Sequence, residues 1–393
     1  MSSITATEAP AVQGRRDRPK VSVVIPCLNE EAGIGPCVTA AVAGMAAAGL
    51  AGEVIVVDNA SEDRSSELAA AAGACVVSEP RRGYGSAYLA GFAAARGDYV
   101  VMADADLTYD FAEIPRFIDR IEQGADVVMG DRMDNIQPGA MPWLHRYVGN
   151  PLLSGFLNLL FRTGVRDAHC GMRAFRRSIL PQLDLRTTGM EFASEMVIRA
   201  SKANLRIEQI PITYHPREGE SKLSSFRDGW RHLRFLLVHS PTYLFVIPGA
   251  LMLLLGVLAS AVTLGHIAVF GRGWQMHTLI AGSLLVVTGI QVIGLGLCAQ
   301  AYAAYFMSDD QGWFRALRER FRLEHGLLAG TLVGLVGVGL GAEVVVNWIS
   351  NGLGPLAQEE QALAAATLII VGVQVFFTSF LLSILGLRRS DRL

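Results

Sequence analysis

The sequence predicts an α/β domain followed by an all-α membrane domain of four transmembrane helices. In the first half of the 393 residues, short β-branched runs alternate with Ala-rich stretches of helical length. In the second half, long runs contain one charged residue or none. Polar residues recur where the predicted strands end. The first two observations define the class of fold, and the third locates a site.

The predicted strands of the α/β domain are short apolar runs bounded by polar or glycine residues. In chain order they are KVSVVIP, EVIVVD, CVVSE, DYVVM and ADVVMGD. Helices are predicted between them over 34–48, 65–73, 83–97 and 111–123. Strands and helices that alternate at this spacing indicate a parallel sheet with helices on both faces.

Polar side chains follow four of these strands. They are Asn29 and Glu30, Asp58, Asp104 and Asp106, and Arg132. In α/β sheets of this kind, ligands bind beyond the carboxyl ends of the strands. We therefore expect these side chains to share one site along one edge of the sheet.

The segment ADADLTYD, residues 103–110, places Asp104 and Asp106 on one turn directly after a strand. A divalent cation offsets the repulsion between two carboxylates, and hard oxygen ligands favour Mg²⁺ or Mn²⁺. Mg²⁺ usually keeps waters and phosphate oxygens in its shell, so a diphosphate is expected beside it. The hydroxyl of Thr108 could be a further ligand. The alternative is a pair of loop aspartates that cap the next helix.

Five segments together resemble the family-2 glycosyltransferases. They are VVIPCLNEE, VIVVDNASED, the run from GYGSAYLAG to ADADLTYD, MGDR and DAHCGMRAF, and the likeness covers about residues 21–240. Within that family the chain is similar to the branch of dolichol-phosphate mannose synthases and bacterial polyprenyl-phosphate glucosyltransferases. The resemblance implies a Rossmann-like nucleotide-sugar-binding domain of the type A glycosyltransferase fold. It also implies that Asp104 and Asp106 bind the metal, with Thr108 where relatives often have Gln.

The resemblance implies roles at the nucleotide end of the site. Pro26, Leu28 and Glu30 correspond to residues that border the base and ribose. Asp58 corresponds to a residue that reaches the base or ribose. Leu28 stands where the family often has Tyr, which weakens the case for base stacking there.

At the reacting end, the resemblance implies a set of basic residues. Arg132 corresponds to an arginine that faces the donor diphosphate or the acceptor phosphate, and Arg146 to an acceptor-phosphate residue. Arg217 and Lys222 correspond to a mobile loop that closes over the diphosphate. The predicted catalytic residues are therefore Asp106, Arg132 and Arg146. The alternative for each arginine is an ordinary surface residue.

The second half of the chain contains four runs long enough to cross a membrane. Charge is absent from 235–271, 273–308 and 361–387, and Glu343 is the one charge within 326–358. Each run exceeds the about 20 residues that a spanning helix needs. Spans are predicted near 243–270, 278–306, 326–349 and 362–386; buried core helices are the alternative. Arginines gather before the first span, between the second and third, and after the fourth. The positive-inside rule thus predicts a cytoplasmic α/β domain and cytoplasmic termini.

Two stretches are predicted to lie in the membrane interface. Residues 223–237 place Phe226, Trp230, Leu233 and Leu237 on one face and arginines on the other. Residues 150–164 are apolar but too short to span. Core packing is the alternative for both. An interfacial site suits a polyprenyl phosphate, because an ionised phosphate can attack without the general base that a sugar hydroxyl needs.

These observations predict a membrane-bound inverting glycosyltransferase of cell envelope glycan synthesis. It would move one hexose, from UDP-glucose or GDP-mannose, to dolichyl or undecaprenyl phosphate at the cytoplasmic face. The alternatives are a processive polysaccharide synthase, which usually carries a QxxRW motif missing here, and a membrane scaffold or flippase with an accessory transferase domain. No nucleic-acid partner is expected, and a homo-oligomer is left open. The predicted parts are a disordered tail (1–20), a catalytic domain (21–222), an interfacial helix (223–240) and a membrane domain (241–393).

Overall fold

The computed structural model describes residues 18–218, 225–268, 271, 273–306, 312–355 and 358–387. The chain divides into two compact units, with the boundary between Leu236 and Leu237. Nearly all of the predicted tail lies outside the described residues, as do Lys222 and the side chain of Phe226. Each unit is described by itself below.

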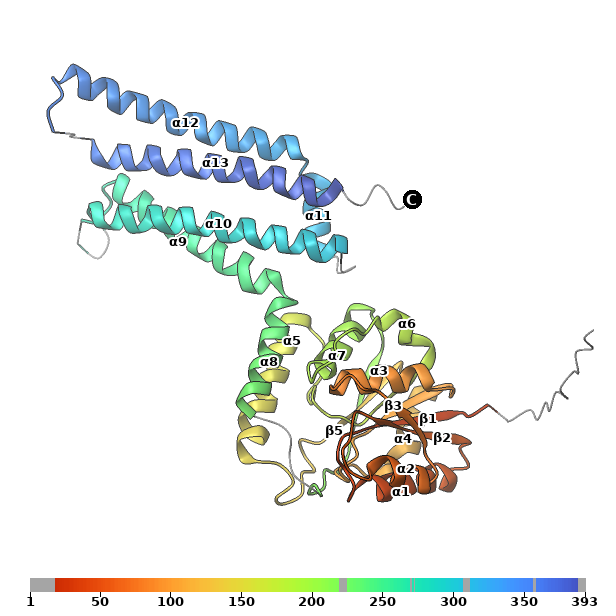
Figure 1. The fold of residues 1–393 in the computed structure, drawn as a ribbon. Coiled ribbons are helices and arrows are strands. Elements are labelled where there is room, and N and C mark those ends of the chain that lie inside the picture. Colours follow the sequence, from red (N-terminus) through yellow and green to blue (C-terminus); the bar gives the residue numbers. More distant parts are fainter. Residues whose placement is uncertain are drawn as a thin grey trace, which may run out of the picture. The chain divides into compact units, whose positions relative to one another are not determined.

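Within the described residues, the first unit is built on a seven-stranded sheet in the order β3-β2-β1-β4-β6-β5-β7. Figure 1 labels β1, β2, β3 and β5 of this sheet. The strands are β1 (Val21–Cys27), β2 (Gly52–Asp58), β3 (Cys75–Ser78), β4 (Tyr99–Met102), β5 (Val127–Asp131), β6 (Arg173–Arg176) and β7 (Ile207–Pro211). The five predicted strands are β1 to β5. The expectation of an all-parallel sheet is wrong at β6, which lies antiparallel between β4 and β5. The four residues RAFR of β6 include two arginines, so they lack the apolar pattern that predicts a buried strand.

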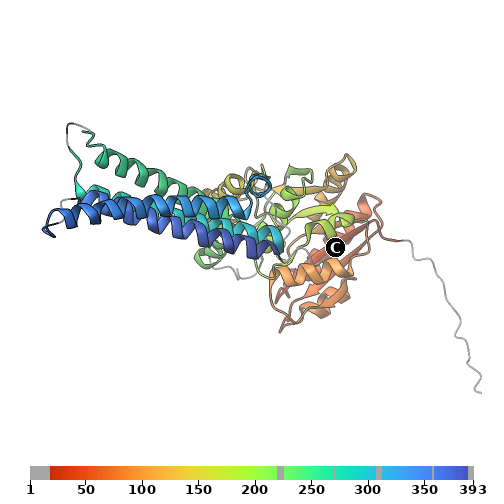
Figure 2. The ribbon, with the colours of Figure 1, turned by 90° about the horizontal axis from the view of Figure 1, so that it is seen from above.

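Helices cover both faces of this sheet (Figures 1 and 2). One face packs against α1 (Ile34–Ala47), α2 (Ser65–Ala71), the short η1 (Phe111–Glu113) and α4 (Ile114–Glu122). The other face packs against α3 (Tyr84–Ala94), α5 (Asn150–Phe161), α7 (Phe192–Lys202) and α8 (Ser225–Val238). Shorter turns complete the unit: η2 (His145–Gly149), η3 (Arg177–Ile179) and α6 (Leu180–Leu183).

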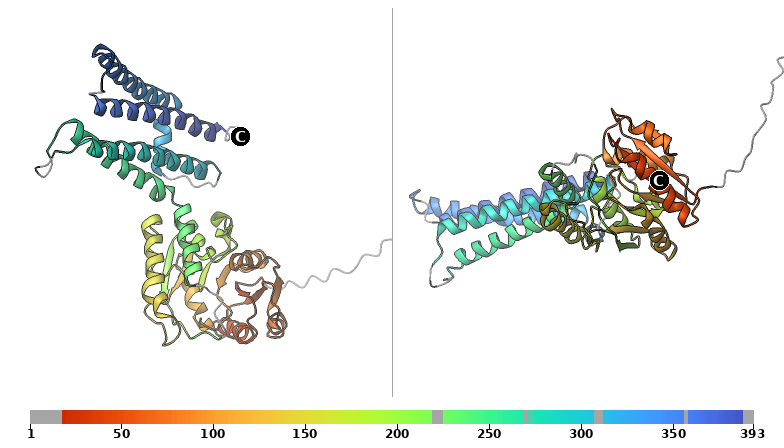
Figure 3. Two further views of the ribbon diagram at one scale, coloured as in Figure 1. Left: turned by 60° about the vertical axis from the view of Figure 1, so that its left-hand side comes forward. Right: turned by 90° about the horizontal axis from the view of Figure 1, so that it is seen from below.

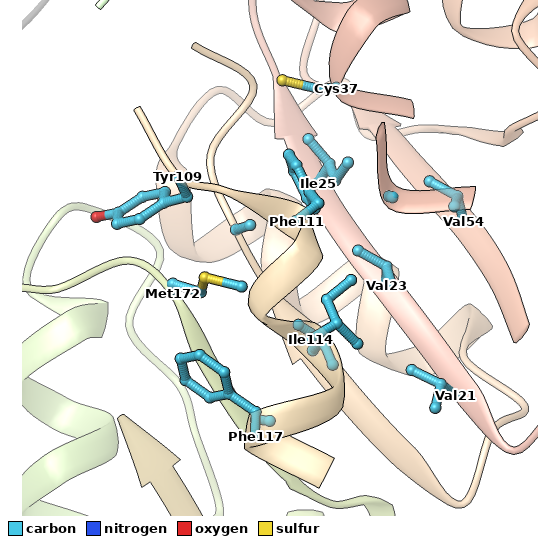
Figure 4. Packing of buried hydrophobic residues seen from close by; sticks show 14 of the residues in the cluster. Val21, Val23, Ile25, Cys37, Val54, Tyr109, Phe111, Ile114, Phe117 and Met172 are labelled. Carbon is cyan, nitrogen blue, oxygen red and sulfur yellow. The ribbon is translucent and has the colours of Figure 1, made fainter. Parts of the chain in front are cut away.

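Alternate residues of β1 show how the strand serves both layers. Val21, Val23 and Ile25 belong to the core that includes η1 and α4, where Phe111 and the neighbouring apolar side chains meet them (Figure 4). Val24 belongs to the core on the opposite face. This period of two is the pattern of a strand buried on both faces, and it explains why the run in the sequence is continuously apolar.

Within its described residues, the second unit contains four helices long and apolar enough to cross a membrane. They are Thr242–Leu264, Met276–Tyr305, Leu323–Ser350 and Glu359–Gly386, close to the four predicted spans. In the structure they comprise η4 (Thr242–Val246) with α9 (Ile247–Leu264), then α10 (Met276–Phe306), α12 (Leu323–Ser350) and α13 (Glu359–Leu387). The short α11 (Gly312–Arg320) precedes α12. The first helix ends earlier than predicted, at Leu264.

These helices form two hairpins, α9 with α10 and α12 with α13 (Figure 3). Glycines let the two backbones of each hairpin approach closely. A Cβ on Gly256 would lie 2.6 Å from the carbonyl oxygen of Gly282, and a Cβ on Gly337 would lie 2.9 Å from that of Ala365. Small residues at such contacts are typical of helix packing in membranes, where dispersion contacts rather than hydrophobic burial hold helices together.

The two hairpins are built alike. Gly289 in α10 and Gly372 in α13 occupy the same place, since each lies against the backbone of the preceding helix of its own hairpin. Two residues further along each helix, Gln374 Nε2 donates a hydrogen bond to Gln291 Oε1 at 3.1 Å. The hairpins therefore meet at equivalent positions, through a polar pair in otherwise apolar helices.

Candidate active site

The carboxyl ends of β1, β2 and β4 lie side by side and carry the predicted acidic residues. β1 pairs in parallel with β2, with Cys27 opposite Asp58, and with β4, with Val24 opposite Met102. The loops that follow these strands therefore deliver their polar side chains to one edge of the sheet. Pro26, Leu28, Glu30 and Asp58 are all half-buried there.

Asp106 is held by its own loop. The Thr108 hydroxyl donates a hydrogen bond to Asp106 Oδ1 at 2.6 Å, and both residues are buried. Between them, Leu107 adopts a positive φ of 60°, a conformation that a non-glycine residue holds only when its surroundings require it. Thr108, predicted as a metal ligand, therefore lies where it orients the Asp106 carboxylate.

Asp104 is half-buried and held from two sides. The Tyr84 hydroxyl donates to its Oδ1 at 3.1 Å, and its Oδ2 lies 2.4 Å from the place where a Cβ on Gly171 would be. Burial, followed by the charge of Asp106, raises the pKa of Asp104 to about 7. A nearby cation would relieve this repulsion.

The two carboxylates suit a cation that takes few protein ligands. Among the described residues, no group of three or more His, Cys, Asp and Glu side chains is placed to hold a metal ion. The hard oxygens of Asp104 and Asp106 are the donors that Mg²⁺ or Mn²⁺ prefers, and Mg²⁺ usually binds one or two carboxylates plus substrate phosphates. The donor set fits such an ion.

Arg217 reaches the acidic edge from a segment far away in the sequence. After β7 the chain runs back along the Asp104–Asp106 loop, where the amide of Glu218 donates to the carbonyl of Asp106 at 3.2 Å. Arg217 Nη2 lies 2.9 Å from Glu30 Oε1, and Nη1 lies 3.6 Å from Asp106 Oδ2. One guanidinium thus bridges the β1 loop and the β4 loop.

Arg132 lies in a buried ion pair instead of on the open edge. Its Nε and Nη2 donate to the two carboxylate oxygens of Asp167 at 2.7 and 2.9 Å. The guanidinium also lies 4.9 Å from the ring centre of Tyr214. Burial alone would raise the pKa of Asp167, but the charge and hydrogen bonds of Arg132 lower it below its usual value. Two of its nitrogens thus bind Asp167, and the third, Nη1, lies 3.5 Å from the Tyr109 hydroxyl, so the phosphate contact expected of Arg132 stays a prediction.

Arg146 has a different environment. It lies on η2, its guanidinium is 5.3 Å from the ring centre of Tyr147, and it forms no ion pair within the described part of the chain. The helical residues beside it in the chain and α5 expose large apolar side chains: Trp143, Leu144, Tyr147, Val148, Leu152 and Leu159. The opposite side of α5 is buried through Ser154 and Leu157. A cation thus lies within an exposed apolar surface, which we call the η2–α5 surface.

The helix α8 also exposes an apolar side chain. Its buried side consists of His232 and Leu236, which pack into the core of the first unit. Trp230, on the face predicted to contact lipid, is 56% exposed, and Arg231 and Arg234 are exposed. Leu233 and Leu237, on the same predicted face, are half-buried, so Trp230 is the residue of that face that the described part of α8 leaves exposed.

Three residues that shape the site were not predicted from the sequence. Asp167 pairs with Arg132, and Tyr84 contacts Asp104. Buried Asn59 donates to the carbonyls of Glu79 and Arg81, which ties the end of β2 to the next loop. All three belong to quoted motifs, DAHCGMRAF, GYGSAYLAG and VIVVDNASED, so the motifs marked the right segments without assigning these side chains.

Paired carboxylates at the edge of an α/β sheet, in a chain with four membrane helices, define an integral membrane protein with the architecture of a nucleotide-sugar transferase. Residues 22–184 match glycosyl transferase family 2, and residues 297–386 match the family 2 C-terminal transmembrane region. The low-salt glycan biosynthesis hexosyltransferase Agl6 of Haloferax volcanii is 43% identical over 370 residues, covering 94% of this chain and 89% of that protein. The chain therefore belongs to glycosyltransferase family 2 and is a glycosyltransferase.

Two further relatives carry informative names. The undecaprenyl-phosphate 4-deoxy-4-formamido-L-arabinose transferase of Pseudomonas aeruginosa is 34% identical over 320 residues, covering 77% of this chain and 89% of that protein. The dolichyl-phosphate hexose transferase of Haloferax volcanii is 38% identical over 179 residues, covering 45% of this chain and 76% of that protein. Both names describe transfer that involves a polyprenyl phosphate.

Proposed function

We propose that the protein transfers one hexose from UDP-glucose or GDP-mannose to a dolichyl or undecaprenyl phosphate. The reaction takes place at the cytoplasmic face of the membrane and uses Mg²⁺ or Mn²⁺. The named relatives support both the hexose and the lipid phosphate. The arginines that flank the predicted spans support the cytoplasmic face.

The observation that carries the proposal is Arg146 within the η2–α5 surface. A lipid phosphate needs apolar surroundings for its chain and a cation for its head group, and this surface offers both. Trp143 and Tyr147 are the residue types enriched at the boundary between lipid and water. Arg146 makes no ion pair with a described residue, so its charge is available for the acceptor phosphate.

The donor is expected on the acidic edge. Pro26, Leu28 and Asp58 lie there and would border the base and ribose, and Asp104 and Asp106 would hold the cation. When bound, the cation neutralises the leaving nucleoside diphosphate.

Two basic residues would approach the donor diphosphate. Arg217 lies beside Asp106 and brings a second positive charge to the same place. Lys222, five residues further on in the sequence and outside the described residues, would add to it.

The acceptor phosphate attacks without a general base. Its oxygen is ionised at neutral pH, so the chain has to orient it and offset its repulsion by the donor diphosphate. The acceptor oxygen bonds to the anomeric carbon as the bond to the diphosphate breaks, which inverts the configuration. Arg146 orients the acceptor. Arg132 is held in place by its ion pair with Asp167 and contributes its positive charge to the site.

The test is a transfer assay with purified full-length protein, Mg²⁺, polyprenyl phosphate and a panel of nucleotide-sugars, with mass spectrometry of the lipid product. One added hexose is expected. Asp104→Asn/Asp106→Asn should abolish transfer, whereas Asp110→Asn should not, because the Asp110 carboxylate caps η1 through the amide of Ala112. A growing polymer would instead favour a polysaccharide synthase. Full transfer by the double Asn variant would rule out a catalytic metal site at Asp104 and Asp106, whereas no transfer by the unmodified protein with any donor would favour the scaffold or flippase.

Arg146 has its own test. Arg146→Ala should raise the KM for polyprenyl phosphate roughly 10- to 150-fold, the range for loss of a hydrogen bond to a charged group. The KM for the nucleotide-sugar should stay unchanged. Arg162→Ala, at the exposed end of α5, is the matched control. An equal rise in both KM values would contradict an acceptor-specific role.

The membrane orientation can be tested with a natural probe. Cys75 is the one exposed cysteine within the described residues, whereas Cys27, Cys37 and Cys170 are buried and Cys298 is half-buried. A maleimide that cannot cross membranes should label Cys75 only after the cells are permeabilised. Labelling of intact cells would place the catalytic domain outside.

A further inference from the structure

Tyr84 has a defined position beside the metal-binding pair and no role in the function proposed above. It is the first residue of α3, and its hydroxyl donates to Asp104 Oδ1 at 3.1 Å. Its ring lies edge-on to Tyr88, with 4.9 Å between ring centres, and to Phe192, with 6.5 Å. These two contacts restrict the ring and keep the hydroxyl pointed at the carboxylate.

The backbone before Tyr84 is fixed as well. Gly83 has a φ of 151°, and its amide donates to Asn59 Oδ1 at 2.6 Å. A Cβ on Gly83 would lie 2.2 Å from the carbonyl oxygen of Thr188, and one on Gly85 would lie 2.2 Å from that of Thr187. The glycines of the RRGYGSA segment therefore let α3 begin against a neighbouring loop, which sets the place of Tyr84 between them.

The second oxygen of Asp104 is confined from the other side. Its Oδ2 lies 2.4 Å from the place of a Cβ on Gly171. Gly171 is itself held, because its amide donates to the Tyr109 hydroxyl at 2.8 Å. Asp104 thus lies between a hydroxyl and a backbone, whereas Asp106 has the hydroxyl of Thr108. Each carboxylate thus accepts from a neutral hydroxyl; Asp106 also accepts from the Thr108 amide at 3.3 Å and lies 3.6 Å from Arg217 Nη1, whereas Asp104 has no such cation in direct contact within the described residues.

A neutral donor suits a metal-binding carboxylate. Two carboxylates one residue apart repel each other and tend to turn apart unless something orients them. A lysine or arginine would orient Asp104 but would also compete with the incoming cation for its charge. A tyrosine hydroxyl fixes one oxygen and leaves the negative charge for the metal, which is how partners behind metal ligands generally act.

We propose that Tyr84 is a positioning residue that, together with Gly171, holds the Asp104 carboxylate ready for the divalent cation. This inference rests on the proposed metal-binding role of Asp104 and Asp106. It gives the RRGYGSA segment a function that its sequence, which lacks a phosphate-binding glycine pattern, does not indicate.

The experiment compares Tyr84→Phe with Tyr88→Phe in purified full-length protein. Tyr88 lies one turn further along α3, and its hydroxyl donates to the carbonyl of Ala103 at 3.2 Å, beside Asp104 but not to its carboxylate. Mn²⁺ binding is measured by electron paramagnetic resonance without any nucleotide-sugar. Tyr84→Phe should raise the Mn²⁺ dissociation constant about 10- to 100-fold. Tyr88→Phe keeps the ring that restricts Tyr84 and removes a hydroxyl that contacts the Tyr84 hydroxyl but not the carboxylate, so it should raise the constant less than Tyr84→Phe does.

Two further measurements complete the test. Transfer by Tyr84→Phe should recover at saturating Mn²⁺, so that the KM for the metal rises while kcat changes little. Gly171→Ala, which pushes a methyl group toward Asp104 Oδ2, should weaken Mn²⁺ binding through an independent change. Unchanged Mn²⁺ affinity in Tyr84→Phe, with normal binding by the unmodified protein, overturns the role of Tyr84 alone. Equal Mn²⁺ binding by Asp104→Asn/Asp106→Asn overturns the metal site itself and this inference with it.

Discussion

The buried pair of Arg132 and Asp167 gives the sharpest prediction about stability. The side chains are 7% and 0% exposed, and three hydrogen bonds join the two residues, including one from the Arg132 amide to Asp167 Oδ2 at 3.2 Å. Asp167→Leu leaves a buried guanidinium without its counter-charge. Removing one partner of a buried ion pair costs about 3–5 kcal/mol of unfolding free energy.

The double variant Arg132→Met/Asp167→Leu isolates the cause. Replacing both charges with apolar side chains of similar size is often neutral or stabilising, because neither charge then has to be desolvated. We therefore expect its stability to lie within about 1 kcal/mol of the unmodified protein. The single variant Asp167→Leu should remain the least stable of the three.

Thermal unfolding in detergent, followed by tryptophan fluorescence, measures the difference. For a domain of roughly 200 residues, each kcal/mol lowers the midpoint by about 2–4 °C, so Asp167→Leu should lose about 6–20 °C. The double variant should unfold near the normal temperature yet transfer hexose poorly, because the charge behind the site is gone. A double variant as unstable as Asp167→Leu would refute the reasoning, since the unpaired charge could not then be the source of the loss.

Three further predictions concern other parts of the chain. Gln291→Leu and Gln374→Leu should each destabilise the membrane helices by about 0.6–1.7 kcal/mol, and the double variant should regain most of the loss; additive losses in a double-mutant cycle would show that the two side chains act separately. Burial, followed by the charge of His232, lowers the pKa of His169 to about 3. Between about pH 3 and about pH 6.5 the unfolded chain therefore binds a proton at His169 that the folded chain does not. The free energy of unfolding is thus highest, as far as His169 is concerned, above about pH 6.5, and it falls as the pH is lowered toward 3. His169→Phe should flatten the fall of the unfolding midpoint between pH 7 and 5, and an unchanged slope would assign it to other groups. Leu152→Asp/Leu159→Asp should impair transfer to polyprenyl phosphate in liposomes while nucleotide-sugar binding, measured by calorimetry, stays normal; normal transfer would remove the η2–α5 surface from the acceptor site.

Local patterns in the sequence predicted the elements whose causes are local. The β-branched run of β1 and the apolar lengths of the four membrane helices need no distant partner to be recognised. β6 was missed for the opposite reason. RAFR becomes a strand because β4 and β5 pair with it on both sides, and nothing within its four residues announces those partners.

The candidate site divides in the same way. Asp104 and Asp106 are neighbours in the chain, so their pairing and the cation it favours could be predicted from the sequence. The partner of Asp104 could not be predicted, because Tyr84, which donates a hydrogen bond to it, lies 20 residues away in the sequence. Arg217 likewise meets Glu30 across 187 residues.

By itself, the sequence determined that the protein has an α/β domain with an acidic edge and four membrane helices, because strand, helix and span lengths follow from short-range apolar patterns. Only the tertiary structure decided which of two arginines forms an ion pair with a described residue and which does not. Arg132 and Arg146 look alike in the sequence, but the fold buries the first against Asp167 and leaves the second among exposed apolar side chains. The charge of an arginine is set by its chemistry, whereas its availability depends on which groups the folded chain brings within hydrogen-bonding distance.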